Sequence, residues 1–312
     1  MNKKRFITLL LALSSLLIGQ RALASTPSGT PDPVTGYITD TDDCTITPDQ
    51  YYMTVYRVGL GNSLPAAPTT SSPIDFSGFV TVFESSSGWR EQVKKGISAP
   101  LTGTKIRPPS GTYTFAYVEL APKIEVKAKA RFNTARWQLI NSATYTNGTY
   151  NNYKENAGAY FWSKNGSTYN WGNPPFGLVG HGATVDNTTY AVTKHFMNSI
   201  ATDSELYSAD FKINGVTASA YLVNSSYKLA SGAAALPSAN PMGDIARIIA
   251  IMPVTLTVTA ENTGLNISFN VSNGSTIHMN HPSNSGRAGY TNGDVAIDCF
   301  GAGPFEPIIT VY

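Results

Sequence analysis

The sequence is poor in charge. Only 13% of its 312 residues are Asp, Glu, Lys or Arg, which is about half the usual share of a soluble domain. Ser, Thr, Asn, Gly and Tyr supply the polarity instead, with 27 glycines and 17 tyrosines in the chain. Hydroxyl and amide side chains on the solvent face of sheets are typical of extracellular β-proteins, so the composition favours that class.

Beyond its first residues the sequence lacks an apolar run of bilayer length. Residues 3–5 are basic, residues 6–19 are mostly apolar, and Ala22-Leu23-Ala24 forms an A-x-A cleavage site. This order predicts a secretory signal peptide at residues 1–24. The alternative is a membrane anchor, but the apolar run falls short of the ~20 residues that a span needs. We therefore expect an exported protein (extracellular, on the cell surface or in the periplasm) with no membrane span after cleavage.

The excess of positive charge belongs to the predicted signal peptide. The whole chain has 22 Lys and Arg against 20 Asp and Glu, a net charge of +2. Lys3, Lys4, Arg5 and Arg21 leave with the signal peptide and no acid does, so the net charge of the mature chain becomes −2. We therefore expect no nucleic-acid partner, because such partners call for a basic surface.

Cysteine is scarce. The chain has two cysteines, Cys44 and Cys299, near opposite ends of the mature sequence. In an oxidising compartment an isolated pair predicts a disulfide. The alternative is two buried thiols.

Motifs of common catalytic sites are missing. The sequence contains no G-x-S-x-G, no H-E-x-x-H and no Gly-Lys-Ser/Thr, which are signatures of hydrolases, zinc proteases and phosphate-binding loops. Acidic residues are too sparse to single out a glycosidase pair. We therefore expect a protein that is not an enzyme and has no cofactor.

Two sets of residues are candidate metal ligands. His278 and His281 form a His-x-x-His that could hold copper or zinc, although zinc normally takes three or four protein ligands. Asp40, Asp42 and Asp43 could supply oxygens to calcium, but they lack the glycine and final glutamate of an EF-hand loop. A polar turn and a solvated acidic turn are the simpler interpretations.

Alternating hydrophobicity predicts a mainly β protein. We expect an antiparallel β-sandwich, as one or two packed sandwiches, with long loops and at most one or two short helices. One such helix is suggested by the spacing of Val192, Phe196 and Ile200, and residues 245–252 fit either a helix or a buried strand. The chain divides into a signal peptide (1–24), an extended N-terminal arm (25–46), a first β-sandwich region (47–135), a Tyr/Asn/Gly-rich β region (136–242) and a C-terminal β-hairpin region (243–312).

Three segments leave alternatives open. The arm at residues 25–46 is either flexible or a strand donated to a neighbouring subunit. Residues 308–312 form a β-rich tail that pairs either in its own sheet or with another subunit. Residues 124–132 alternate apolar and charged side chains, which predicts a half-exposed strand. Its charges either protect a sheet edge, which we prefer, or bind an acidic ligand.

An aromatic hairpin is the candidate ligand site. Asn165-Gly166 predicts a tight turn, and counting outward from it pairs Trp162 with Tyr169 and Tyr160 with Trp171. These four aromatic side chains would then share one face of the hairpin. Such a face either packs against the hydrophobic core and covers it, or forms a flat platform for sugars.

One turn and strand carry a family resemblance. Pro108-Pro109-Ser110-Gly111 turns the chain into Gly111-Thr112-Tyr113, which begins a strand. This stretch, within residues 105–120, resembles the transthyretin-like (prealbumin-like) β-sandwich modules of bacterial surface and pilus proteins. The resemblance implies a sandwich fold and a surface role, and it brings no catalytic residue with it.

Three functions follow, in order of preference. The first is a secreted or surface-exposed structural protein, a subunit of an appendage, coat or matrix whose partners are copies of itself or other surface subunits. The alternative is a glycan-binding adhesin that uses the aromatic hairpin. The third is an exported hydrolase.

Overall fold

The computed structural model describes residues 29–39, 41–93, 101–138, 153–165, 178–196, 208–213, 216–231, 243–262, 264–280, 294–303 and 305–312. The regular structure of these residues consists of β-strands, and no helix occurs among them. The predicted mainly β, sandwich-like fold class is thus confirmed. Accordingly, the described residues offer no helix with the length and hydropathy to cross a bilayer.

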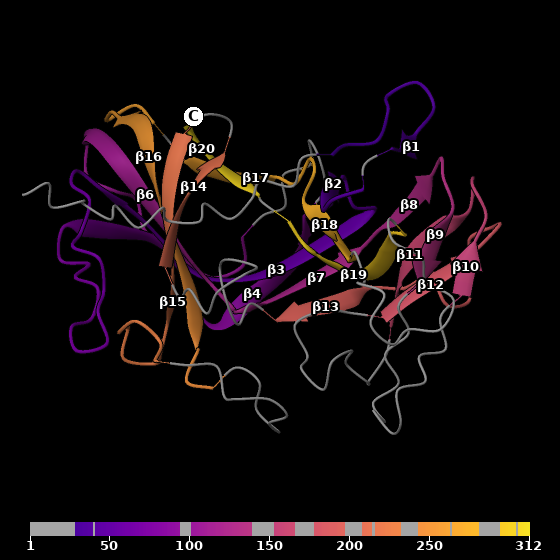
Figure 1. Ribbon diagram of the computed structural model, residues 1–312. Helices are drawn as coiled ribbons and strands as arrows, with labels where there is room; N and C mark the ends of the chain where they lie inside the picture. The colour runs from indigo at the N-terminus through magenta and orange to yellow at the C-terminus, as the bar shows by residue number, and fades with distance from the viewer. Residues whose placement is uncertain are drawn as a thin grey trace, which may run out of the picture.

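A nine-stranded sheet forms the larger part of the fold (Figure 1). Its spatial order is β13 (Thr193–Phe196), β7 (Lys123–Lys127), β3 (Gln50–Gly61), β6 (Gly111–Leu120), β16 (Arg247–Val258), β15 (Val216–Val223) and β14 (Ser208–Ile213), with β4 (Phe79–Val93) paired to β3 and β5 (Thr104–Lys105) paired to β4. Neighbouring strands in this sheet are antiparallel.

The strand β16 resolves one ambiguous segment. Residues 245–252 fitted a helix or a buried strand, and from Arg247 onward they form a strand between β6 and β15. Ile248, Ile249, Ala250 and Ile251 are all buried. Both faces of residues 248–252 are covered, so this part of the strand is a continuous apolar run. Beyond it Pro253, Thr255 and Thr257 are exposed, and the strand alternates.

The main core lies between this sheet and a two-stranded ribbon. The ribbon pairs β17 (Leu265–Asn270) with β20 (Glu306–Val311). Ile267 and Phe269 of β17 are buried in the same cluster as Tyr51, Val55 and Val118 of the sheet. The predicted apolar face of β17 is therefore the face that packs on the core, and the β-rich tail pairs within its own chain.

A second core lies between two smaller sheets, which gather at one end of the molecule (Figure 1). One sheet contains β1 (Tyr37–Ile38), β8 (Lys129–Phe132), β11 (Tyr160–Lys164) and β12 (Leu178–Gly182), in that order. The other contains β10 (Tyr153–Glu155), β9 (Arg136–Gln138), β19 (Ala296–Ala302), β18 (Ser275–Asn280) and β2 (Cys44–Ile46). Phe132, Phe161, Ile277 and Phe300 fill the space between the two sheets.

One continuous segment, residues 123–132, serves both cores. β7 and β8 are separated by Ala128 alone. Ile124 and Val126 are in the main core, whereas Ala128, Ala130 and Phe132 are in the second. The alternation predicted for this segment is correct, but its interpretation as an edge strand is wrong, because β7 lies between β3 and β13 and β8 lies between β1 and β11.

The N-terminal stretch predicted as an arm is anchored from Gly29 onward. Gly29 forms a parallel bridge with Cys44, β1 pairs with β8 and β2 pairs with β18. Ile38 and Cys44 have no exposed surface. These contacts place Ile38, Cys44 and Ile46 in the second core of the same chain.

The short helix suggested by Val192, Phe196 and Ile200 is not present where the chain is described. Residues 193–196 form β13, which pairs with β7 through residues Lys123 to Val126. Residues 197–207 lie outside the described residues. The sheet edge offered by β7 outweighs the helical spacing of only three apolar positions.

Candidate functional site

The aromatic face around β11 differs from the predicted hairpin in its pairing. Tyr160 and Trp162 share one face of β11, but Trp162 lies opposite Gly180 of β12 and Lys129 of β8. Both sides of β11 are thus occupied, so Trp162 does not pair with Tyr169. Tyr169 itself and Trp171 lie outside the described residues.

Trp162 is buried, with 3% of its surface exposed. Its indole lies over β12, where a Cβ on Gly180 would approach indole Nε1 to 2.2 Å. The indole N–H donates a hydrogen bond to Thr189 Oγ1 at 3.2 Å. The ring therefore packs on a strand that has no side chain beneath it, and it is not an open platform for a sugar.

Tyr160 belongs to a half-buried aromatic row on the outer face of the same sheet. Arg131 of β8 lies between Tyr37 and Tyr160, opposite both in the strand register. Its guanidinium carbon is 4.7 Å from the ring centroid of Tyr37 and 5.0 Å from that of Tyr160. Arg131 Nε also donates to the carbonyl of Gly158 at 2.7 Å. Among the described residues of the predicted platform, Tyr160 is the one that stays partly exposed, and it does so within this Tyr37–Arg131–Tyr160 row.

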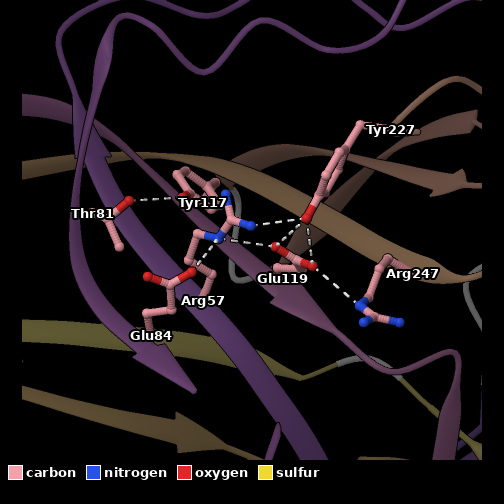
Figure 2. A network of polar contacts seen from close by, with 7 residues as sticks. All are labelled: Arg57, Thr81, Glu84, Tyr117, Glu119, Tyr227 and Arg247. Atoms are coloured by element: carbon pink, nitrogen blue, oxygen red, sulfur yellow. Dashed lines mark hydrogen bonds and ion pairs between the residues drawn. The ribbon is translucent and has the colours of Figure 1, made fainter. Parts of the chain in front are cut away.

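A second polar cluster, which we call the Glu119 network, lies on the outer face of the nine-stranded sheet (Figure 2). Glu119 of β6 is only 2% exposed, and it lies between Arg57 of β3 at 3.3 Å and Arg247 of β16 at 3.1 Å. The hydroxyl of Tyr227 donates to Glu119 at 3.2 Å and accepts from Arg57 Nη2 at 2.8 Å. Glu84 of β4 approaches Arg57 at 3.8 Å.

Aromatic rings surround the same network. The guanidinium of Arg247 lies 3.8 Å from the ring centroid of Tyr56, and the Tyr117 hydroxyl is within 3.5 Å of Thr81 Oγ1. Tyr227 adopts a left-handed backbone conformation with φ of 59°, which is uncommon for a bulky residue. That conformation places its hydroxyl between Arg57 and Glu119, where Figure 2 shows it.

The electrostatics keep these groups in fixed charge states. Burial raises the pKa of Tyr117, and burial together with the charge of Glu119 raises the pKa of Tyr227. For Arg57, burial lowers the pKa, but the charge of Glu119 acts together with Tyr117, Tyr227 and Glu84 to outweigh burial, so the net pKa is raised. The tyrosines therefore stay neutral and Arg57 stays charged near neutral pH, which suits cross-strand bonding better than proton transfer.

Sequence reasoning missed the Glu119 network because its members are far apart in the chain. Arg57 and Tyr227 are separated by 170 positions. A signal was nevertheless present: Arg57 and Glu119 are single charges inside otherwise apolar or aromatic strand segments. A charge in such a position must find a partner when the strand is buried.

The predicted disulfide is wrong. Cys44 pairs with Ile277 of β18, and Ile277 pairs on its other side with Phe300, the residue after Cys299. One strand thus separates the two cysteines, which places them roughly 9–10 Å apart across the sheet, beyond the ~7 Å that a disulfide tolerates. Because side chains alternate along a strand, Cys44 and Cys299 also point to opposite faces. Both cysteines are buried.

The candidate metal ligands that the structure describes do not form a cluster. Asp43 accepts a hydrogen bond from the backbone N–H of Met279 at 2.7 Å, and Asp40 and His281 lie outside the described residues. His278 occupies β18, where its backbone is opposite Cys299. Within the described ranges, no three His, Cys, Asp or Glu residues are placed to hold a metal ion.

The charges of residues 123–132 are bound to other strands. Glu125 of β7 is buried and accepts from Arg90 of β4 at 2.7 Å. Lys129 of β8 is 3.0 Å from Asp49, which also accepts from the hydroxyl of Tyr190 at 2.6 Å. The first ion pair spans β3, which lies between β4 and β7, and the second ties β8 to the residue that precedes β3. These partners explain why a charged face occurs on strands that are not edges.

Comparisons of the chain with protein-family models, with curated proteins and with solved structures gave no match.

Proposed function

We propose that the protein is an exported structural protein of the cell surface, a subunit of an extracellular appendage, coat or matrix, and not an enzyme. The observation that carries this proposal is the outer side of β20. Among the described residues, β17 is the strand to which β20 is hydrogen-bonded. Ile308 of β20 is 43% exposed, and Tyr312, which follows the strand, is 68% exposed. An edge strand with exposed apolar side chains is a template for pairing with another chain.

The polar clusters support the same proposal. The charged groups of the Glu119 network form ion pairs with one another, and so do Arg90 with Glu125 and Lys129 with Asp49. Groups used in this way hold sheets together and leave little capacity for chemistry on a substrate. The predicted signal peptide supplies the route to the surface.

The test compares assembly of the mature protein with that of two lysine variants. We expect particles or fibres of the wild type in negative-stain microscopy and a concentration-dependent mass in ultracentrifugation. Ile308→Lys should reduce assembly, because a charge on an edge strand opposes pairing. Val34→Lys is the matched control, since Val34 is 90% exposed but lies away from the ribbon. A wild type that stays monomeric at every concentration would refute the proposal.

A second candidate function, glycan binding, is favoured by the Tyr37–Arg131–Tyr160 row. Tyrosine rings stack on sugars, and a guanidinium between them adds hydrogen-bond donors. If this row binds glycans, Tyr37→Ala and Tyr160→Ala should each abolish signals on a glycan array, whereas Tyr312→Ala should retain them. A wild type without signal above background would remove this candidate.

A further inference from the structure

A groove of about 550 Å³ opens at the edge of the main core. It lies between β4 and β5 on one side and the β17–β20 ribbon on the other, with the end of β16 beneath. Its floor is apolar and contains Val82, Phe83, Val258 and Ile267, all buried members of the main core. The volume falls in the range of small-molecule sites, which are concave and mostly apolar.

The rim of this groove is cationic on one side. Lys105 and Arg107 line it and are exposed, and no acidic side chain is among its lining residues. Arg107 Nη2 donates to the carbonyls of Thr259 and Ala260, both at 2.9 Å. These bonds hold the guanidinium at the mouth of the groove.

One carboxylate lies near this rim without lining the groove. Hydrogen bonding by Thr259 and, to a smaller extent, the charge of Arg107 lower the pKa of Glu261, which is fully exposed. The side chains that line the groove therefore include two cations and no acid, and the solvated carboxylate of Glu261 stays outside the lining.

We propose that this groove binds a linear alkyl carboxylate, a fatty acid, with its chain on the apolar floor and its carboxylate at Lys105 and Arg107. The floor offers apolar contact without polar groups that a chain would leave unsatisfied. The rim offers charge-assisted hydrogen bonds to a carboxylate. The proposal of this binding activity does not rest on assembly through β20.

The experiment titrates the full mature protein with octanoate, decanoate and dodecanoate, each below its micelle concentration, in a calorimeter. Affinity should rise about fourfold for each methylene added to the chain, until the groove is filled. Dodecanol, which has no charge, should bind more weakly than dodecanoate.

Four variants locate the site. Lys105→Gln should weaken dodecanoate binding roughly two- to fivefold at low salt and leave dodecanol binding unaffected. Lys194 is an exposed lysine on β13, and Lys194→Gln should leave the affinity for both ligands unchanged. Leu265→Trp should fill the groove and abolish binding of both ligands. Ile106→Trp, at the exposed rim, provides the same test if Leu265→Trp fails to fold.

Three results would overturn the proposal. One is a calorimetric titration that shows no binding heat for any of the carboxylates; binding of an extended apolar peptide alone would count as this result. Another is an affinity that does not depend on chain length. The third is dodecanoate binding that survives the groove-filling variants with unchanged affinity.

Discussion

Glu119 shows at the scale of one residue how a buried charge can be tolerated. Its carboxylate is held by two arginines and a tyrosine. We expect Glu119→Gln to lower the free energy of unfolding by about 2–4 kcal/mol, because it removes the buried counter-charge that Arg57 and Arg247 share. Urea unfolding measures this loss.

Glu84 provides the control for that measurement. It contacts the same Arg57, but 53% of its side chain is exposed. Glu84→Gln should therefore change the free energy of unfolding by less than about 1 kcal/mol. Equal losses in the two variants would show that the burial of Glu119 does not set its contribution.

His195 predicts a dependence of stability on pH. Burial lowers the pKa of His195 to about 4, whereas in the unfolded chain it is about 6.5. The unfolded state therefore binds the extra proton between these values, and stability falls as the pH drops from 6.5 towards 4. The loss at the acid end is roughly 3 kcal/mol.

An asparagine variant isolates this histidine. Nδ1 of His195 accepts from the backbone N–H of Ala302 at 2.8 Å, and the amide oxygen of His195→Asn can accept the same bond. Unfolding midpoints of His195→Asn between pH 4 and 6.5 should be much flatter than those of the wild type. Hydrogen-bonded carboxylates such as Asp32 and Asp75 have a lowered pKa, so they act below this window.

Single residues were the hardest features to predict from the sequence. The alternation of residues 124–132 correctly gave the apolar side, but not that Glu125 on the other side is buried against Arg90. The disulfide prediction failed because the sequence indicates an oxidising compartment but does not show which strands become neighbours in the sheet. Partners 35 or more positions apart depend on which strands become neighbours, and local patterns carry no such information.

At the scale of elements, β12 shows how glycine can be required in a strand. Gly180 lies under the indole of Trp162. We expect Gly180→Ala to destabilise the protein by about 1–3 kcal/mol, because the new methyl group forces the indole out of its packing position. Thermal unfolding measures this change.

Gly78 is the matched position for comparison. A Cβ there would meet only Ser63 Oγ, at 3.6 Å, and the residue is exposed. Gly78→Ala should leave the melting temperature nearly unchanged. A neutral Gly180→Ala would mean that the Trp162 ring can move without cost.

Elements with strong alternation were predictable, and their neighbours were not. The strands at β3, β6 and β17 lie where the period of two placed them. β12 has glycine at 180 and 182, a composition typical of loops, yet it forms a strand, because the Trp162 side chain of β11 covers Gly180. The local composition of β12 favours a loop, and the segment becomes a strand because β11 pairs with it.

For the whole molecule, the shared segment 123–132 predicts cooperative unfolding. The two cores have separate sets of residues but one strand segment in common. Phe161→Ala, in the second core, should cost about 3–5 kcal/mol, and it should lower the unfolding midpoint of both cores together. Circular dichroism and tryptophan fluorescence should then give coincident curves. Two separated transitions would indicate cores that unfold independently.

The shared segment also makes the inward–outward alternation of side chains in one core depend on that in the other. Apolar side chains at even positions face the main core before Ala128 and the second core after it. Deleting Lys127 would leave the phase of Ile124 and Val126 intact but turn Ala130 and Phe132 outward and their charged neighbours inward. A second deletion or a compensating insertion just beyond Phe132 would not turn Ala130 and Phe132 back toward the core, because both changes lie after these residues. Insertions and deletions within this segment should therefore be rejected, whereas substitutions that keep its parity should be tolerated.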